Sequence, residues 1–222
     1  MKILALDSTT KILTLGIYNE GAESEYNLEV GRKLSQLIDK SVERVLAASG
    51  ITLGEIDYFT CGLGPGSFTG MRVSISFIKG LSWANKKPVI GISTLDIIAQ
   101  QVKEDNCPIV SAIDARRNLI YACIYKKKSG RLKKISPYML LSIGDLLKKV
   151  PEGSLILGDA LSLYAEDFLK VAQAVRLLEK EFWYPRAHNL VRLALEKIKK
   201  KQVQNAFSIK PLYLYPKECQ IK

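Results

Sequence analysis

The sequence predicts an α/β fold made of two similar lobes. Three short apolar strands near the N-terminus precede the order helix, strand, helix, strand, and the second half of the chain repeats this order more weakly. With 222 residues, of which 47% are hydrophobic, the chain can bury a core in each of two lobes. We expect the lobes to be residues 1–102 and 103–222, with the tail 205–222 packed back on the body.

The first lobe is expected to begin with strands at 3–6, 12–18 and 23–28. The polar sequence Asp7-Ser8-Thr9-Thr10 separates the first two strands, so it forms the tip of an apolar hairpin. Asn19-Glu20-Gly21 is suited to the turn between the second and third strands.

A helix is expected next, over residues 32–49, and Gly50 is suited to end it. Apolar residues recur there at the i, i+3, i+4 spacing of an amphipathic helix, and they are Leu34, Leu37, Ile38, Val42, Val45 and Leu46. A strand at 58–61 then leads through a glycine-rich loop into a second helix at 69–84.

This second helix is apolar on more than one side. Its large apolar residues are Met71, Val73, Ile75, Phe77, Ile78, Leu81 and Trp83. A helix that is apolar nearly all round is buried on two fronts. We therefore expect it to contact a partner as well as the core of its own lobe.

The rest of the chain continues the alternation of strands and helices. We expect strands at 88–92, 108–113, 119–125 and 154–157, and helices at 94–102, 142–149, 161–170 and 187–200. The apolar tail Pro211-Leu212-Tyr213-Leu214-Tyr215 is expected to pack against the body.

The composition excludes several classes of protein. A single histidine, His188, rules out a zinc hydrolase with several ligands, and we expect this residue at a helix start or in the core. The four cysteines are scattered without a C-x-x-C pair, which indicates buried thiols in a reducing compartment. The apolar segment before Asp7 is too short for a signal peptide and no apolar run reaches the roughly 18 residues of a membrane span. We expect a cytoplasmic protein.

The chain is strongly basic, with a net charge of +11 from 33 basic and 22 acidic residues. Basic residues gather at 126–128, 131–134 and 197–201. Such clusters suit a polyanion such as RNA, but they are also typical of a solvated lysine-rich surface, and no aromatic residues interleave with them. Both interpretations stay open.

The most informative segment is the loop from Gly62 to Arg72, with the sequence GLGPGSFTGMR. A glycine-rich turn that leads into a helix directs N–H groups and partial positive charge toward one point, which suits a phosphate or a carboxylate. Its spacing differs from the Walker A and G-x-G-x-x-G motifs. The candidate phosphate-facing residues are Gly64, Gly66 and Ser67. The alternative is a structural turn whose glycines permit close packing.

Two further sets of residues can serve the same chemistry. Asp7 can hold Mg²⁺ while Ser8 and Thr9 bind phosphate, or the three can simply cap a turn. Asp114 and Arg116 follow a predicted strand, where they can bind a metal and a phosphate or form a structural ion pair.

Several segments together resemble the TsaB (YeaZ) family and cover nearly the whole chain. They are ILALDST at 3–9, GPGSFTGMR at 64–72, KGL at 79–81, GISTL at 91–95, DARR at 114–117, YPRA at 184–187 and PLYL at 211–214. The loop at 64–72 is the most specific of these, and their order in the chain strengthens the resemblance.

The resemblance implies a two-lobed actin/Hsp70/sugar-kinase-like fold with a reduced second lobe. It implies a subunit with little catalysis and no metal of its own, which pairs with the catalytic subunit TsaD and the ATPase TsaE. Together they pass a threonylcarbamoyl group from its adenylate to the adenosine beside the tRNA anticodon, with ATP and Mg²⁺ acting at the level of the complex. The family pairs through its first two helices, here Leu34, Leu37, Ile38, Val42, Val45, Gly70, Met71, Ser74, Phe77, Ile78 and Leu81.

Two departures from the family pattern bear on docking or cleft chemistry. Leu34-Ser35-Gln36 stands where many relatives have His-Ser-Glu, and Tyr213-Leu214-Tyr215 stands where Tyr-Leu-Arg is usual. The competing hypothesis is an independent ATP-dependent phosphotransferase or ATPase, in which Asp7 holds the metal and the glycine loop holds phosphate. Without its partner, an uncovered apolar helix pair would favour a homodimer.

Overall fold

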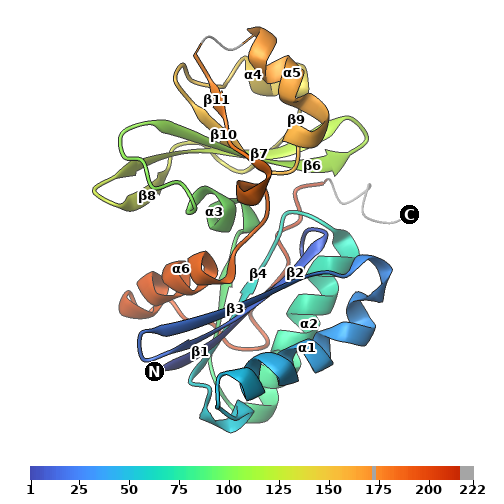
Figure 1. Cartoon of the computed structure of the whole chain (residues 1–222), viewed down its shortest axis with the longest axis vertical. Helices are drawn as coiled ribbons and strands as arrows, with labels where there is room; N and C mark the ends of the chain where they lie inside the picture. Colours follow the sequence, from blue (N-terminus) through green and yellow to red (C-terminus); the bar gives the residue numbers. More distant parts are fainter. Residues whose placement is uncertain (172–173, 216–222) are drawn as a thin grey trace. The chain divides into compact units, whose positions relative to one another are not determined.

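The computed structural model describes residues 1–171 and 174–215, and the chain forms two compact units (Figure 1). Unit 1 contains Met1–Ile97 and Pro185–Leu212. Unit 2 contains Ile98–Tyr184 and the segment that begins at Tyr213.

Unit 1 is built on a five-stranded sheet in the order β3-β2-β1-β4-β5. Its strands are β1 (Lys2–Asp7), β2 (Ile12–Asn19), β3 (Ala22–Glu29), β4 (Tyr58–Gly62) and β5 (Val89–Ile92). The first three strands pair antiparallel as a meander, whereas β4 runs parallel to β1 and β5 runs parallel to β4. The ends of β1 and β4 therefore lie at the same edge of the sheet.

Helices cover both faces of this sheet (Figure 1). On one face lie α1 (Leu34–Ala48) and α2 (Phe68–Asn85), and on the other lies α6 (Ala187–Lys199). Successive side chains of β1 point to opposite faces. Leu4 and Leu6 accordingly belong to the core under α1 and α2, while Ile3 and Ala5 belong to the core under α6. The short helices η1 (Gly31–Lys33), η2 (Leu53–Glu55) and α3 (Thr94–Ala99) complete the connections.

Unit 2 repeats the plan of unit 1. Its strands are β6 (Pro108–Arg116), β7 (Leu119–Lys128), β8 (Arg131–Lys134), β9 (Met139–Ser142), β10 (Leu155–Leu157) and β11 (Arg176–Leu177). The sheet order is β11-β10-β6-β7-β8, and β9 pairs with β7. Strands β6, β7 and β8 form an antiparallel meander, while β10 is parallel to β6 and β11 is parallel to β10, just as β4 and β5 follow β1. This confirms the expected duplicated α/β fold of the actin/Hsp70/sugar-kinase class.

The helices of unit 2 are α4 (Ile143–Leu147), α5 (Leu161–Val171) and the short η3 (Lys180–Phe182). Leu146 of α4 and Phe168 of α5 are completely buried in the same core as Ile156 of β10. Strands β8, β9 and β11 were not predicted, because they are only two to four residues long and β8 has the polar sequence RLKK.

The predicted lobe boundaries need one correction. The expected division at 102/103 lies close to the observed crossing after Ile97, but residues 185–212 return to unit 1 instead of staying in the second lobe. The reason is α6, whose residues Ala187, Leu190, Val191 and Ala194 pack in the same core as Ile3 and Ala5. A helix that is amphipathic in sequence does not reveal which sheet it will cover.

The predicted tail packs back as far as the structure describes it. Ile209 is buried in the core of unit 1, and the Leu212 N–H donates to the Leu63 carbonyl oxygen at 2.8 Å. The Tyr215 hydroxyl donates to the Ala115 carbonyl oxygen of unit 2 at 2.9 Å. Residues 216–222 of this predicted tail, Cys219 among them, lie outside the described residues.

Candidate functional site

The Asp7-Ser8-Thr9 tip and the glycine loop contact each other directly. They follow the neighbouring parallel strands β1 and β4, which end at the same edge of the sheet. The Ser67 N–H donates to the Thr9 carbonyl oxygen at 2.6 Å, and the Ser8 hydroxyl donates to the Gly70 carbonyl oxygen at 3.0 Å. The first turn of α2 is therefore fastened to the hairpin tip.

The glycines of the loop are required by this close contact. A Cβ added at Gly62 would overlap the Asp7 carboxylate, and one added at Gly70 would overlap the Ser8 carbonyl oxygen. At Gly66 the added atom would overlap the Thr9 carbonyl oxygen. The loop is a close-packed turn in this structure.

The Asp7 carboxylate is completely buried and its oxygens are engaged by neighbours. Its Oδ1 accepts hydrogen bonds from both the backbone N–H and the hydroxyl of Thr9, each at 2.7 Å, and its Oδ2 accepts one from the Thr94 hydroxyl at 3.2 Å. The two threonine hydroxyls lie 2.8 Å apart. We call Asp7, Thr9 and Thr94 the Asp7 cluster.

Burial raises the pKa of Asp7 to about 6, although the hydrogen bonds from Thr9 and Thr94 favour the charged form. Thr94 was missed as a site residue, since the sequence indicated only the start of a helix there. Its N–H donates to the Gly64 carbonyl oxygen at 2.8 Å, so it joins the glycine loop to the tip. Within residues 1–171 and 174–215, no group of three or more His, Cys, Asp or Glu residues is placed to hold a metal ion.

The predicted nucleotide-facing role remains untested, but the tip residues are not open in this structure. Asp7, Ser8 and Thr9 are each at most 1% exposed, and Gly64 is also buried. Ser67 is exposed, but its hydroxyl accepts from the Gly70 N–H at 3.2 Å as the N-cap of α2. Phosphate or metal binding by the tip would require these contacts to separate.

Asp114 and Arg116, in unit 2, form an ion pair, which was one of the two predicted roles of these residues. Arg116 Nη1 lies 3.2 Å from Asp114 Oδ2, and the Arg116 N–H donates to Asp114 Oδ1 at 2.8 Å across a β-bulge. Asp159 Oδ1 accepts from the Asp114 N–H at 2.9 Å. The carboxylate of Asp114 is thus used to shape the turn between β6 and β7.

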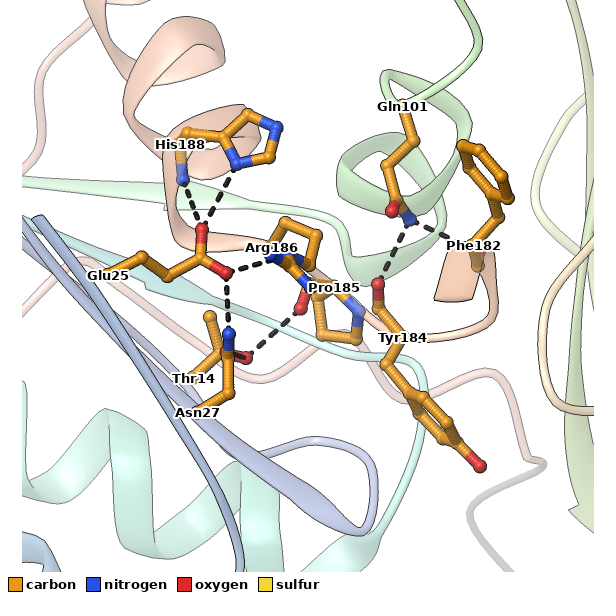
Figure 2. Close-up of polar contacts among 9 residues, drawn as sticks. All are labelled: Thr14, Glu25, Asn27, Gln101, Phe182, Tyr184, Pro185, Arg186 and His188. Carbon is orange, nitrogen blue, oxygen red and sulfur yellow. Dashed lines mark hydrogen bonds and ion pairs between the residues drawn. The ribbon is translucent and has the colours of Figure 1, made fainter. Parts of the chain in front are cut away.

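A second polar cluster lies where the chain returns to unit 1 (Figure 2). Glu25 of β3 accepts hydrogen bonds from Asn27 Nδ2 at 2.6 Å and from the His188 N–H at 3.3 Å. Its carboxylate also lies 3.0 Å from His188 Nδ1 and 2.6 Å from Arg186 Nε. The Pro185 carbonyl oxygen lies 3.0 Å from the Thr14 hydroxyl.

These contacts hold the pKa of Glu25 at about 2, well below its usual range. Partial burial alone would raise it, but the hydrogen bonds from His188 and Asn27 and the charge of Arg186 outweigh that effect. His188 is the second residue of α6, so it lies at a helix start, as predicted. On the other side of the crossing point, the Gln101 amide donates to the carbonyl oxygens of Phe182 and Tyr184 at 3.1 and 2.9 Å (Figure 2). Sequence reasoning missed Glu25, because its partners Arg186 and His188 are about 160 residues away.

Comparison with known proteins decides the family. The family model described as "TsaD: tRNA N6-adenosine threonylcarbamoyltransferase" matches residues 28–215, most of the chain. The curated relatives include the tRNA threonylcarbamoyladenosine biosynthesis protein TsaB of Escherichia coli, which is 35% identical over 129 residues, and that of Bacillus subtilis, which is 26% identical over 229 residues. The chain belongs to the TsaB (YeaZ) family.

The extent of these matches differs between relatives. The match to the Escherichia coli protein covers 57% of this chain and 56% of that protein, so it spans only about half of each, whereas the match to the Bacillus subtilis protein covers 100% and 97%. Among solved structures, YeaZ from Pseudomonas aeruginosa superimposes with a TM-score of 0.83 at 25% identity, covering 96% of this chain and 99% of that one. The predicted family is confirmed over the full fold.

The family's expected partner residues lie mainly in the core of unit 1. Those that are buried are Leu34, Ile38, Val42, Val45, Gly70, Met71, Ser74 and Ile78, while Leu37, Phe77 and Leu81 are partly buried against the same core. A stripe at helical spacing identifies the face that packs against a sheet just as well as a face that awaits a partner. The periodic stripe of α1 faces the core, and the predicted role of these residues in partner binding remains untested.

The residues exposed on α2 differ from those expected to contact the partner. The exposed face of α2 consists of Phe68, Thr69, Arg72, Ser76, Gly80, Trp83 and Ala84. Several of these side chains are small, so the sequence pattern of large apolar residues did not single them out. Of the two large apolar residues on this face, Trp83 is 68% exposed and Phe68 is 37% exposed.

The structure also shows where the two segments that depart from the family pattern lie. Leu34 is buried in the core, whereas Ser35 and Gln36 are exposed at the start of α1. Tyr215 packs edge-on against Tyr121, with ring centroids 5.9 Å apart. Burial, with a smaller contribution from Tyr215, raises the pKa of Tyr121 to about 12. At this position the tyrosine provides a packing contact in unit 2.

Proposed function

We propose that this chain is the non-catalytic partner subunit for the synthesis of threonylcarbamoyladenosine in tRNA. In this proposal it forms a heterodimer with the catalytic subunit TsaD and acts together with the ATPase TsaE. ATP and Mg²⁺ serve the complex, and the chain itself holds neither. The named TsaB relatives belong to this biosynthesis, and family membership extends the role to the present chain.

The observation that carries the non-catalytic role is the closed Asp7 cluster. In kinases and ATPases that use such a tip, the carboxylate must face the metal and the loop must face phosphate. Here the Asp7 oxygens accept three hydrogen bonds from Thr9 and Thr94, and Gly66 and Gly70 leave no space between loop and tip. The elements of the phosphate site have become a packing contact that fixes the start of α2.

The exposed face of α2 supports the proposed pairing. Ser76, Gly80 and Ala84 follow one another at intervals of four residues, so they lie along one line of the helix. A Cβ at Gly80 would meet nothing within 4 Å, which shows that the helix surface is open there. A partner helix can approach closely along small residues.

We propose that the chain acts in the cytoplasm. Cys61, Cys107 and Cys123 are free thiols, as a reducing compartment would keep them. Among the described residues, no helix is long and apolar enough to cross a bilayer. When the partner is missing, the same α2 face is available to a second copy of the chain, which gives a homodimer.

The test is complex formation with the TsaD counterpart, measured by size exclusion with light scattering at micromolar concentration. Gly80→Glu places a charge on the open line of α2 without touching the core, so we expect it to abolish the complex and leave the fold intact. Leu163→Glu is the matched control, because Leu163 is 61% exposed on α5 in unit 2. Complexes that form equally with both variants would refute the proposed face.

A direct test of the competing ATPase hypothesis uses the chain alone. Steady-state ATP turnover that depends on Mg²⁺ and disappears in Asp7→Ala would establish independent catalysis. We expect no such turnover, because the carboxylate is enclosed by Thr9 and Thr94.

A further inference from the structure

A groove of about 670 Å³ lies at the C-terminal end of α2, within unit 1. Its walls come from two distant parts of the sequence, the end of α2 with the residues that follow it and the segment around Gln204–Phe207. The second segment is held against the edge strand β5, where the backbones of Val89 and Gln204 exchange hydrogen bonds of 2.9 and 2.8 Å. The groove is within the size range of ligand-binding pockets.

Two large aromatic side chains line this groove and are uncovered. Trp83 is 68% exposed and Phe207 is 77% exposed. The backbone under Phe207 is fixed, since the Asn205 side-chain oxygen accepts from the N–H groups of Phe207 and Ser208, both at 2.9 Å. A rigid turn that presents such a side chain to water indicates a binding surface.

The charge of the groove has a single sign. Its only charged lining residues are Lys86 and Lys87, and neither forms an ion pair within the part of the chain that the structure describes. Lys199, Lys200 and Lys201 are exposed and precede Gln204 by three to five residues, so they lie on the chain leading into the groove wall. Lys197 is different, because its ammonium donates to the Gly91 carbonyl oxygen at 2.8 Å.

We propose that this groove binds an unpaired stretch of RNA, with bases stacked on Trp83 and Phe207 and with phosphates neutralised by Lys86 and Lys87. Proteins that bind single-stranded nucleic acids combine these two elements, a basic path for the backbone and exposed aromatic side chains for the bases. Lys86 and Lys87 closely follow Trp83 in the sequence, and the fold adds Phe207 from a distant segment.

An acidic peptide is the other partner that lysines would attract. A peptide interface centres on side chains that enter fully enclosed pockets. Here the protein itself supplies two exposed aromatic rings, and the basic residues continue beyond the groove toward Lys201, which suits a longer polyanion. The proposal rests on the proposed function, since that pathway supplies the RNA as tRNA.

The experiment measures fluorescence anisotropy of a labelled 12-nucleotide single-stranded RNA and of a tRNA transcript, with the full-length chain alone. We expect Trp83→Ala and Phe207→Ala each to weaken binding about tenfold or more, from the loss of one stacked base. Phe207→Tyr keeps an aromatic ring and should bind normally, whereas Phe207→Leu keeps an apolar side chain and should not. The Lys86→Gln and Lys87→Gln double variant should flatten the dependence of affinity on salt.

The controls are Leu169→Ala, which removes a side chain that is 62% exposed on α5, and Lys103→Gln, which removes an exposed charge in unit 2. Thermal unfolding followed by circular dichroism checks that every variant is folded. Absence of RNA binding at 100 micromolar protein, or equal binding by all folded variants, would overturn the proposal.

Complex formation with the TsaD counterpart, measured on the same variants, separates this proposal from the proposed function. If the complex forms while RNA binding ignores Trp83 and Phe207, the groove proposal fails and the partner role stands. If RNA binding depends on the groove but no complex forms, the partner role fails instead. Loss of the complex in Phe207→Ala with unchanged RNA binding would make the groove a protein-docking surface and refute our proposal.

Discussion

Replacing Asp7 by asparagine separates the two chemical roles available to this buried carboxyl. Asparagine keeps the shape and an oxygen that can accept from Thr9, but it carries no charge. The folded protein raises the pKa of Asp7 from 3.8 to about 6 because the side chain is completely buried. Between these two pH values the folded state therefore binds more protons than the unfolded state.

The sign and size of the effect follow from this difference. A raised pKa in the folded state means that the contribution of Asp7 to stability is fully present below about pH 4 and is lost as the pH rises to about 6. A difference of roughly two pKa units corresponds to about 3 kcal/mol, at about 1.4 kcal/mol per unit. Part of this change falls below pH 4.5, so relative to the wild type Asp7→Asn should gain about 2 kcal/mol in free energy of unfolding between pH 4.5 and pH 7.5.

Urea unfolding of both proteins at pH 4.5, 5.5, 6.5 and 7.5 measures this change. Using the difference between the two proteins removes the contributions of all other titrating groups and of any packing defect in the variant. Most of the change should lie below pH 6.5. A difference that is the same at every pH, or that moves in the opposite direction, would refute the account of Asp7 as a carboxylate held in a closed cluster.

Two further predictions concern the contacts that hold unit 1 together. Gly70→Ala should lower the free energy of unfolding by about 2–3 kcal/mol, because the added Cβ overlaps the Ser8 carbonyl oxygen. Gly80→Ala, at an open position of the same helix, should raise it by about 0.5–1 kcal/mol. Equal effects of the two substitutions in urea unfolding would contradict the close-packed loop. Glu25→Gln should cost on the order of 1–2 kcal/mol at pH 7, and since the folded pKa of Glu25 is lowered to about 2, this cost should vanish as the pH falls from about 4.5 toward 2. Acid titration of both proteins by circular dichroism tests the second point, and parallel acid transitions would contradict it.

Much of the fold could be predicted because local patterns determine it. The strands β1 to β3 alternate with polar turns, and α1 carries a clear stripe that ends at Gly50. These signals need only neighbouring residues. The loop at 64–72 is equally local, and its motif led directly to the family.

The candidate site could be predicted only in part, because its chemistry depends on contacts between distant residues. The sequence indicated both Asp7 and the glycine loop as candidate phosphate-site residues. The hydrogen bond that engages the second carboxylate oxygen of Asp7 comes from Thr94, however, 87 residues away. Whether a glycine faces a phosphate or a neighbouring carbonyl oxygen cannot be determined from its spacing. Here Gly66 and Gly70 face the backbone of the tip.

The predicted interface residues remain untested, but most of them are buried in the core of the chain itself. Val42 and Ile78 have the helical spacing expected of interface residues, but that spacing equally marks the side of a helix that faces its own sheet. The groove could not be predicted from the sequence, since Trp83 and Phe207 are 124 positions apart. They line the same groove in the folded chain, where Val89 pairs with Gln204.

The most direct test of the central claim is tRNA modification by the reconstituted complex. The reaction contains the TsaD counterpart, tRNA and threonylcarbamoyl-adenylate, with or without this chain, and the modified nucleoside is quantified by mass spectrometry after digestion. We predict that modification requires the chain, persists with Asp7→Asn and is lost with Gly80→Glu. Full modification without the chain, or its loss in Asp7→Asn while the complex still forms, would contradict the account of a partner subunit whose old phosphate site is closed.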